Sequence, residues 1–335
     1  MHKKLTIFFS FIVIIIAAAG FIYYNLSLKP VKAEAGNIIT VTIPSGANSN
    51  KIGAILEENH LIRNKTMFKL YSKINGLDNK YKAGTYDISS SMDVKAISEI
   101  LRNGKGFAET IKFTIPEGYE VRMIIDKLVE LGLGERTKYE DLMKNADFDY
   151  SFIKAIKREE GKLEGYLFPD TYEVYKGSDE KEIIKKMLSR FDAIFNDEYK
   201  KRAEELNMSI DEVITLSSII EREAKLEKDR KIISSVFHNR LKNKMLLQSC
   251  ATIQYILKER KEVLLYKDLE VKSPYNTYKN QGLPPGPIAS PGLKSIEAAL
   301  YPDDTDYLYF FALDDGSHVF SKTFKEHIQA QNKYK

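Results

Sequence analysis

The alternation of apolar and polar residues in the first third of the chain predicts a small mixed unit of strands and helices. Residues 37–43 carry apolar side chains at every second position and then reach Pro44-Ser45-Gly46, which is typical of a strand that runs into a turn. Apolar residues at helical spacing then predict two short helices, around residues 52–56 and 67–74. A second strand is expected at residues 84–88. The predicted order is strand, helix, helix, strand.

The remaining sequence predicts a mainly helical region that ends in a small β part. A helix is expected from Ser91, as its cap, to Asn103, before Gly104. Near the carboxyl end, residues 307–312 and 318–321 have the pattern of a β-hairpin. The fold class is therefore α+β. The helices expected between these elements cover residues 121–131, 180–195, 198–206, 210–224 and 231–241.

Two segments interrupt the helical pattern, and one short sequence occurs twice. Residues 273–292 contain five of the ten prolines, which excludes regular structure, and an ordered loop of this length is usually functional. Residues 163–172 are rich in aromatic residues, which either form a functional loop or close the core beneath one. The motif Thr-Ile-Pro-x-Gly occurs at residues 42–46 and 114–118, either by chance or as a recurrent strand–turn–helix junction.

The amino terminus predicts a membrane anchor. A basic start is followed by an apolar run from Leu5 to Tyr24, which has about the 20 residues that a helix needs to cross a bilayer. The alanines at residues 17–19 are compatible with a signal-peptidase site, but the apolar run continues past them, which favours an uncleaved anchor. We therefore expect residues 1–26 to form a cytoplasmic stub and a single transmembrane helix, with everything beyond Leu26 outside the cell membrane.

Composition narrows the class of protein. The 335 residues allow two domains, and the hydrophobic fraction of 43% is ordinary for a folded protein. The net charge of +4 comes from interspersed charges of both signs, so no nucleic-acid partner is indicated. Cys250 is the only cysteine, which excludes an intrachain disulfide, and the five histidines are scattered. We expect no metal site and no cofactor.

The strongest candidate for chemistry is a carboxyl group at the edge of an apolar helical face. Ser209 and Glu212 form the pattern of a capping box, so a helix should begin at Ile210. Glu221 then falls at the border of the apolar face, whereas Arg222 is expected to point to water. Because burial disfavours the ionised form, a part-buried Glu221 would hold a proton and act as a general acid.

Helical periodicity does not choose one acid in this helix. Glu223 also borders the apolar face. In a simpler interpretation, either carboxylate caps a neighbouring helix or pairs with Arg230 or Arg240. The spacing of residues therefore does not decide whether Glu221 or Glu223 is the acid, or whether both have a structural role.

Six motifs follow one another along the chain. They are Leu-Glu-Gly-Tyr-Leu-Phe-Pro-Asp-Thr-Tyr at 163–172, Ile-Ile-Glu-Arg-Glu-Ala at 219–224, Val-Phe-His-Asn-Arg-Leu at 236–241, Leu-Gln-Ser at 247–249, Ser-Pro-Tyr-Asn-Thr-Tyr at 273–278 and Gly-Leu-Pro-Pro-Gly-Pro-Ile at 282–288. In this order they resemble the motifs of the endolytic murein transglycosylases, the YceG-like family. Members of that family have an amino-terminal anchor, a LysM-like subdomain and a catalytic domain related to soluble lytic transglycosylases. The resemblance implies a LysM-like βααβ lobe at residues 37–106, although a generic α+β lobe has the same pattern, and a catalytic domain at residues 107–335.

The same resemblance assigns roles to individual residues. Glu221 matches the catalytic acid of the family, and Glu223 becomes a supporting residue. Relatives often have Asp-Pro where this chain has Cys250-Ala251, which leaves Glu221 without a neighbouring carboxylate in the sequence. The residues expected to bind substrate are Gln248, Tyr275, Asn276, Thr277, Tyr278 and Tyr166, with tyrosine rings stacking on sugars, and Glu164 and Asn239 are expected to support the site.

The function implied by the resemblance is cleavage of peptidoglycan. The expected partners are glycan strands, the cytoplasmic membrane and peptidoglycan synthases. One acid would protonate the leaving oxygen of the glycosidic bond and then deprotonate the muramoyl C6 hydroxyl, which closes a 1,6-anhydro ring. A muramidase that hydrolyses the same bond is an alternative. A second is a tethered peptidoglycan-binding protein without catalysis.

Overall fold

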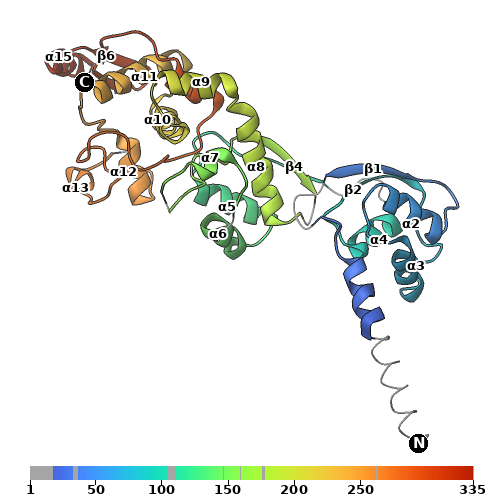
Figure 1. Cartoon of the computed structure of the whole chain (residues 1–335). Coiled ribbons are helices and arrows are strands. Elements are labelled where there is room, and N and C mark those ends of the chain that lie inside the picture. The colour runs from blue at the N-terminus through green and yellow to red at the C-terminus, as the bar shows by residue number, and fades with distance from the viewer. Residues whose placement is uncertain are drawn as a thin grey trace, which may run out of the picture. The chain divides into compact units, whose positions relative to one another are not determined.

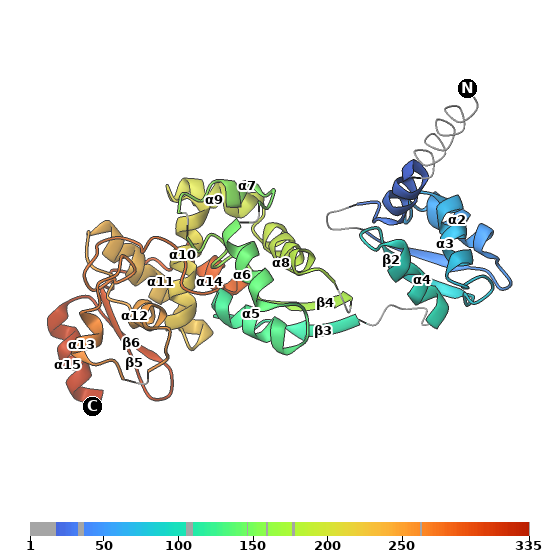
Figure 2. The ribbon, with the colours of Figure 1, turned by 90° about the horizontal axis from the view of Figure 1, so that it is seen from below.

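The chain divides into two compact units. The computed structural model describes residues 18–32, 37–104, 110–145, 147–158, 160–175, 178–261 and 263–334. Unit 1 comprises Met1–Ile111 with Val174–Lys176, and unit 2 comprises Lys112–Glu173 with Gly177–Lys335. Figures 1 and 2 label the helices and strands of both units.

Unit 1 has the strand–helix–helix–strand order predicted from the sequence. The antiparallel partners β1 and β2 place Ile38 opposite Ser89 and Ile43 opposite Gly84. Alternate residues of both strands, together with the apolar faces of the helices, form a buried core. The elements are β1 (Ile38–Ile43), α2 (Ser49–Glu58), α3 (Lys65–Ile74), β2 (Gly84–Ser89) and α4 (Val94–Asn103).

The start of α4 differs from the prediction. Asp93, and not Ser91, is the cap, and its carboxylate accepts a hydrogen bond from the amide of Ala96. Ser91 instead bonds to the hydroxyl of Ser89. The predicted stop at Gly104 is confirmed, because this residue closes the helix in the left-handed conformation, with φ of 67°.

Only the end of the predicted anchor lies within the described residues. Residues 1–17 lie outside them, and residues 18–28 are helical. Phe21, Ile22 and Tyr23 are exposed in this helix. Within the described ranges, no helix combines the length and the apolar character needed to cross a membrane.

The rest of the chain is mainly helical, with two small sheets. β3 pairs with β4, which lies beside it in Figure 2, and β5 pairs with β6 in the predicted hairpin. The elements are β3 (Thr110–Thr114), α5 (Val121–Glu130), α6 (Arg136–Asn145), α7 (Ser151–Lys154), β4 (Thr171–Tyr175), α8 (Glu180–Ile194), α9 (Asp197–Glu205), α10 (Ile210–Glu223), α11 (Glu227–Lys242), α12 (Cys250–Leu257), α13 (Tyr266–Leu269), α14 (Leu293–Leu300), β5 (Tyr309–Ala312), β6 (His318–Ser321) and α15 (Phe324–Tyr334).

The repeated Thr-Ile-Pro-x-Gly motif forms the same junction twice. Each copy begins at the end of a strand and precedes a helix, β1 to α2 in the first and β3 to α5 in the second. Gly46 and Gly118 close the two turns with φ of 73° and 74°. Residues with a Cβ atom rarely adopt this left-handed conformation, which explains the glycine at the fifth position of both copies. The repeat is therefore a local structural solution used in both units.

Helix α10 packs against α14 and α11, and Figure 2 labels the three helices close together in unit 2. It begins at Ile210 with the predicted capping box of Ser209 and Glu212. All residues from Val213 to Ile220 are buried, so the helix is enclosed on every side and is not amphipathic here. The hydroxyls among them bond to backbone carbonyls of the preceding turn, which removes the cost of burying them.

Candidate active site

The carboxylate of Glu221 lies in the last turn of α10, against the amino terminus of α14. Its side chain is 8% exposed. The oxygen Oε2 accepts hydrogen bonds from Nη1 of Arg230 at 3.0 Å, from Oγ of Ser295 at 2.7 Å and from the amide of Gly292 at 3.0 Å. Of the partners named in the simpler interpretation, Arg230 is the one that pairs with Glu221. Three donors on one oxygen hold the carboxyl group in a single orientation.

The second oxygen of Glu221 has a different environment. Within the part of the chain that the structure describes, no protein group donates a hydrogen bond to Oε1. Oε2 already accepts from three donors, and Arg230 and Ser295 fix the plane of the carboxyl group. Oε1 is therefore the oxygen that a ligand could contact.

Glu223 contacts a different set of residues from Glu221. Its Oε1 accepts a hydrogen bond of 2.5 Å from the hydroxyl of Ser249. The amide of Ser249 donates to Oγ1 of Thr277, and the amide of Gln248 donates to the carbonyl of Thr277. The fold therefore brings together the Leu-Gln-Ser segment, the 273–292 loop and the end of α10. These segments are far apart in the sequence.

Gln248 is the most exposed of the predicted binding residues in this group. Its backbone has φ of 49°, in the left-handed region. Such a conformation costs a non-glycine residue about 1 kcal/mol or more, and it persists here because Thr277 holds the adjacent amide. The residue is exposed, so its amide side chain is accessible to a ligand.

Two tyrosines of the 273–292 loop are half-buried beside α12. The hydroxyl of Tyr278 lies 3.0 Å from Sγ of Cys250, the position where relatives often have aspartate. The ring of Tyr275 packs against Tyr255, with 5.1 Å between their centroids. Burial raises the pKa of Tyr275 and of Tyr278, so both stay neutral hydroxyl groups. Each keeps a partly accessible ring.

The prediction that Tyr166 stacks on a sugar is wrong. Its ring is fully buried, stacked against Phe152, and its hydroxyl donates to Asp211. The other interpretation of residues 163–172, aromatics that close the core, is the correct one for this side chain. Aromatic residues in a segment interrupted by glycine and proline do not distinguish a sugar-binding loop from a buried core, because both favour large flat side chains.

Asn276 and Thr277 are also buried and contact the protein only. The Nδ2 atom of Asn276 donates to the carbonyls of Leu269 and Val271, and its Oδ1 accepts from the amide of Tyr278. Both residues are at most 1% exposed. They shape the loop from inside and are not in a position to contact a sugar.

The two remaining supporting residues hold neighbouring segments. Glu164 caps α5 by accepting from the amide of Val121, and burial raises its pKa to about 8. Asn239 donates to the carbonyls of Thr305 and Tyr307 and so fixes the chain that leads into β5. Neither side chain contacts Glu221 or Glu223 through a hydrogen bond in the described part of the chain.

Arg222 does not point to water as expected. Its Nη1 donates to the carbonyl of Gly118, and burial lowers the pKa of its guanidinium group. This bond joins the end of α10 to the second Thr-Ile-Pro-x-Gly turn. A helical wheel did not predict it, because the wheel describes one helix and not the segments packed around it.

The same turn supplies a residue that the sequence analysis missed. Glu117 stands at the variable position of the second turn, and Glu221 therefore does have a neighbouring carboxylate. Burial, together with the charge of Glu221, raises the pKa of Glu117, and Arg230 acts in the opposite direction. The sequence contained one signal for this residue. The variable position of the repeat is Ser45 in the first copy and a glutamate in the second.

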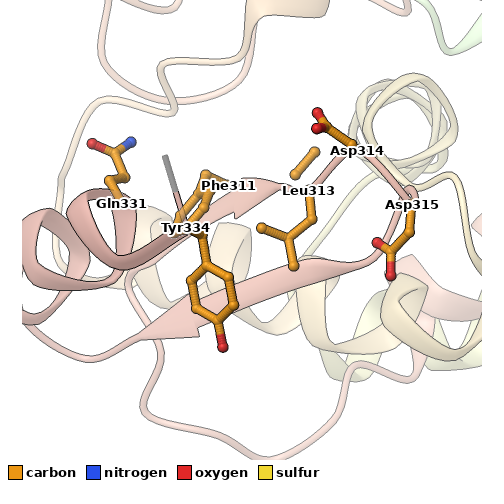
Figure 3. Close-up of a pocket in the computed structure, with 7 residues that line it drawn as sticks. Phe311, Leu313, Asp314, Asp315, Gln331 and Tyr334 are labelled. Atoms are coloured by element: carbon orange, nitrogen blue, oxygen red, sulfur yellow. The ribbon is translucent and has the colours of Figure 1, made fainter.

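A separate cavity of about 380 Å³ lies between the β5–β6 hairpin and α15 (Figure 3). It contains none of the predicted site residues. Hydrogen bonds from the hydroxyl and the amide of Ser317 lower the pKa of Asp315 in its wall. Its lining residues are Phe311, Ala312, Leu313, Asp314, Asp315, Gln331 and Tyr334.

Comparison with known proteins agrees with the motifs. The model of the YceG-like family matches residues 41–333. The chain belongs to the YceG-like family. It is 39% identical over 337 residues to the endolytic murein transglycosylase of Bacillus subtilis (strain 168), covering 96% of this chain and 91% of the relative. All residues of the candidate site lie inside the matched range.

Two further YceG-like relatives extend the comparison. The endolytic murein transglycosylase of Streptococcus pneumoniae serotype 2 (strain D39) is 30% identical, covering 97% of this chain and 64% of that protein. A crystal structure of a yceG-like protein from Listeria monocytogenes is 41% identical and covers 87% of this chain and 98% of its own, with a TM-score of 0.60. Both units of the present chain therefore have counterparts in other members of the family.

Proposed function

We propose that this chain is an endolytic murein transglycosylase. It cleaves the β-1,4 bond between N-acetylmuramic acid and N-acetylglucosamine within glycan strands and leaves 1,6-anhydro ends. The observation that carries the proposal is its 39% identity, over 96% of its length, to a Bacillus subtilis protein of that name. Trimming or termination of nascent strands, beside peptidoglycan synthases, is the role that we infer for it in the cell.

Glu221 is the acid in this proposal. With Oε2 occupied by Arg230, Ser295 and Gly292, the protonated Oε1 gives its proton to the glycosidic oxygen as the bond to the muramoyl C1 breaks. The resulting carboxylate takes the proton of the C6 hydroxyl while that oxygen bonds to C1. One proton is given and one returns, and no water is consumed.

The glycan groove in this proposal runs past the 273–292 loop. Gln248, exposed and held by a strained backbone, is the polar contact to the sugar. The half-buried rings of Tyr275 and Tyr278 offer stacking surfaces. The buried Asn276 and Thr277 act through the loop that they hold, and Glu223 orients the adjacent Ser249.

Product analysis tests the activity and separates it from its alternatives. Purified protein acting on peptidoglycan should release internal fragments that end in 1,6-anhydromuramic acid, which mass spectrometry distinguishes by the loss of one water. Reducing muramic acid ends would instead identify a muramidase. Binding of glycan strands without cleavage would identify a tethered binding protein.

Membrane anchoring and glycan binding by unit 1 complete the proposal. The apolar run from Leu5 to Tyr24 supports an uncleaved single-pass anchor with a cytoplasmic amino terminus. The βααβ order of unit 1 supports a LysM-like lobe that binds peptidoglycan outside the membrane. Cell fractionation should recover the full-length chain, by mass, in the membrane pellet. A soluble form that begins near Gly20 would contradict the anchor.

A further inference from the structure

Glu117 lies beside the proposed acid, although 104 positions separate the two residues in the sequence. Its Oε1 is so close to Gly292 that a methyl group added there would lie 1.8 Å from it. The amide of the same Gly292 donates to Oε2 of Glu221 at 3.0 Å. Covalent geometry then limits the separation of the two carboxylate oxygens to about 7 Å.

The turn that carries Glu117 is fixed in place. The amide of Gly118 donates to the carbonyl of Ser290, and the amide of Ser290 donates to the carbonyl of Tyr119, both at 2.8 Å. A methyl group on Gly118 would lie 3.8 Å from Cγ of Glu221. The backbone thus holds the second carboxylate against the end of α10.

Arg230 is the cation that forms an ion pair with Glu221, and Arg222 adds a second positive charge at the end of α10. Glu117 is exposed as a whole residue and has no hydrogen bond or ion pair within the described residues. Partial burial of its carboxyl group, and then the charge of Glu221, raise its pKa, and Arg230 lowers it.

The other charged groups near the pair have partners of their own. Glu223 accepts from Ser249, and Glu120 pairs with Arg122. Lys294 lies near Glu227 and Glu297, at 3.8 Å and 3.4 Å. Arg222 donates to the Gly118 carbonyl and to Gln254, and not to a carboxylate. Among the described residues, Glu117 is therefore the one carboxylate of this group without a hydrogen bond or an ion pair. Charged side chains on the surrounding elements include Arg222 and Glu223 on α10, Glu227 and Arg230 on α11, Lys294 and Glu297 on α14, and Glu117 and Glu120 before α5.

We propose that Glu117 is a positioning residue that keeps a proton on the Glu117–Glu221 pair up to a higher pH than Arg230 would otherwise allow. The inference rests on the proposed function. Oε2 of Glu221 accepts hydrogen bonds from Arg230, Ser295 and the Gly292 amide, whereas a general acid must also carry a proton. Two carboxylates at this separation repel each other, so the pair retains one proton, which Glu221 transfers to the glycosidic oxygen.

The test is the pH dependence of kcat/KM for anhydromuropeptide formation. In Glu117→Gln the alkaline limb should move down by about one pH unit, because the repelling charge is gone. Activity then falls about tenfold at pH values above the limb and changes little below it. Glu227→Gln removes an exposed carboxylate of α11 that contacts Lys294 and not Glu221, so it should keep the parental profile.

A second variant moves Glu117 without replacing it. Gly292 has φ of −76° and ψ of 169°, which alanine adopts without strain. The methyl group of Gly292→Ala displaces the Glu117 carboxylate, while the amide that donates to Glu221 remains. Its alkaline limb should shift in the same direction as that of Glu117→Gln, and thermal melts of both variants check the fold.

The possible outcomes separate this inference from the proposed function. Parental pH limbs in both variants would overturn it, whether or not the rate changes. A uniform loss at every pH with a raised KM would also overturn it, because Glu117 would then be a sugar contact. Absence of anhydro products from the parent protein would instead refute the proposed function.

Discussion

Glu221→Gln should lower the rate of anhydromuropeptide formation by roughly 10²- to 10⁴-fold. Glutamine keeps the shape of the side chain and its oxygen still accepts from Ser295 and the Gly292 amide, but it neither gives nor takes the proton. The measurement is the initial rate of product release, followed by mass spectrometry, against the parent protein at the same pH.

The same substitution should also lower the stability of the protein. It removes the charge that faces Arg230, whose side chain is only 12% exposed. Leaving a buried cation without its anion is unfavourable, although the amide oxygen still accepts its hydrogen bond. We expect a loss of about 1–3 kcal/mol in the free energy of unfolding, measured by denaturant titration. The protein should remain folded at 25 °C, so the rate loss is interpretable.

Glu223→Gln is the matched control on the same helix. An amide oxygen can still accept the hydrogen bond from Ser249, and no proton transfer is assigned to this side chain. It should lose much less activity than Glu221→Gln. If Glu223→Gln were the inactive variant and Glu221→Gln nearly normal, the assignment of the acid would be wrong. Activity in both would remove the end of α10 from catalysis.

Asn276→Ala should lower the free energy of unfolding by about 2–4 kcal/mol. The substitution leaves the carbonyls of Leu269 and Val271 and the amide of Tyr278 without their partner, in a place that is closed to water. Activity should fall as well, because the 273–292 loop loses the bond that fixes Tyr278. Denaturant titration and the rate of product release measure the two effects.

Asn280→Ala is the control for this prediction. Asn280 belongs to the same loop and its amide also donates to two backbone carbonyls, those of Ser273 and Asn276, but it is exposed. Water replaces its hydrogen bonds, so its loss should cost less than about 1 kcal/mol. Equal stability losses in the two variants would show that burial of Asn276 does not strengthen the loop.

The sequence by itself determined the features that depend on neighbouring residues. The capping box of Ser209 and Glu212 needs only four consecutive residues, and the stop at Gly104 needs one residue that tolerates positive φ. The strands of unit 1 and the final hairpin follow from alternation within a few positions. The motifs also identified the family, because their residues and their order can be compared along the chain without knowledge of any tertiary contact.

The tertiary structure decided which side chains meet and which are buried. Tyr166 and Asn276 are of residue types that often bind sugars, yet both are buried by segments that the sequence does not place beside them. Glu117 reaches the site of Glu221 only because the turn before α5 bonds to the segment before α14. Propensity and periodicity act over a few residues, whereas these hydrogen bonds join positions up to 172 residues apart, and only packing of the whole unit fixes them.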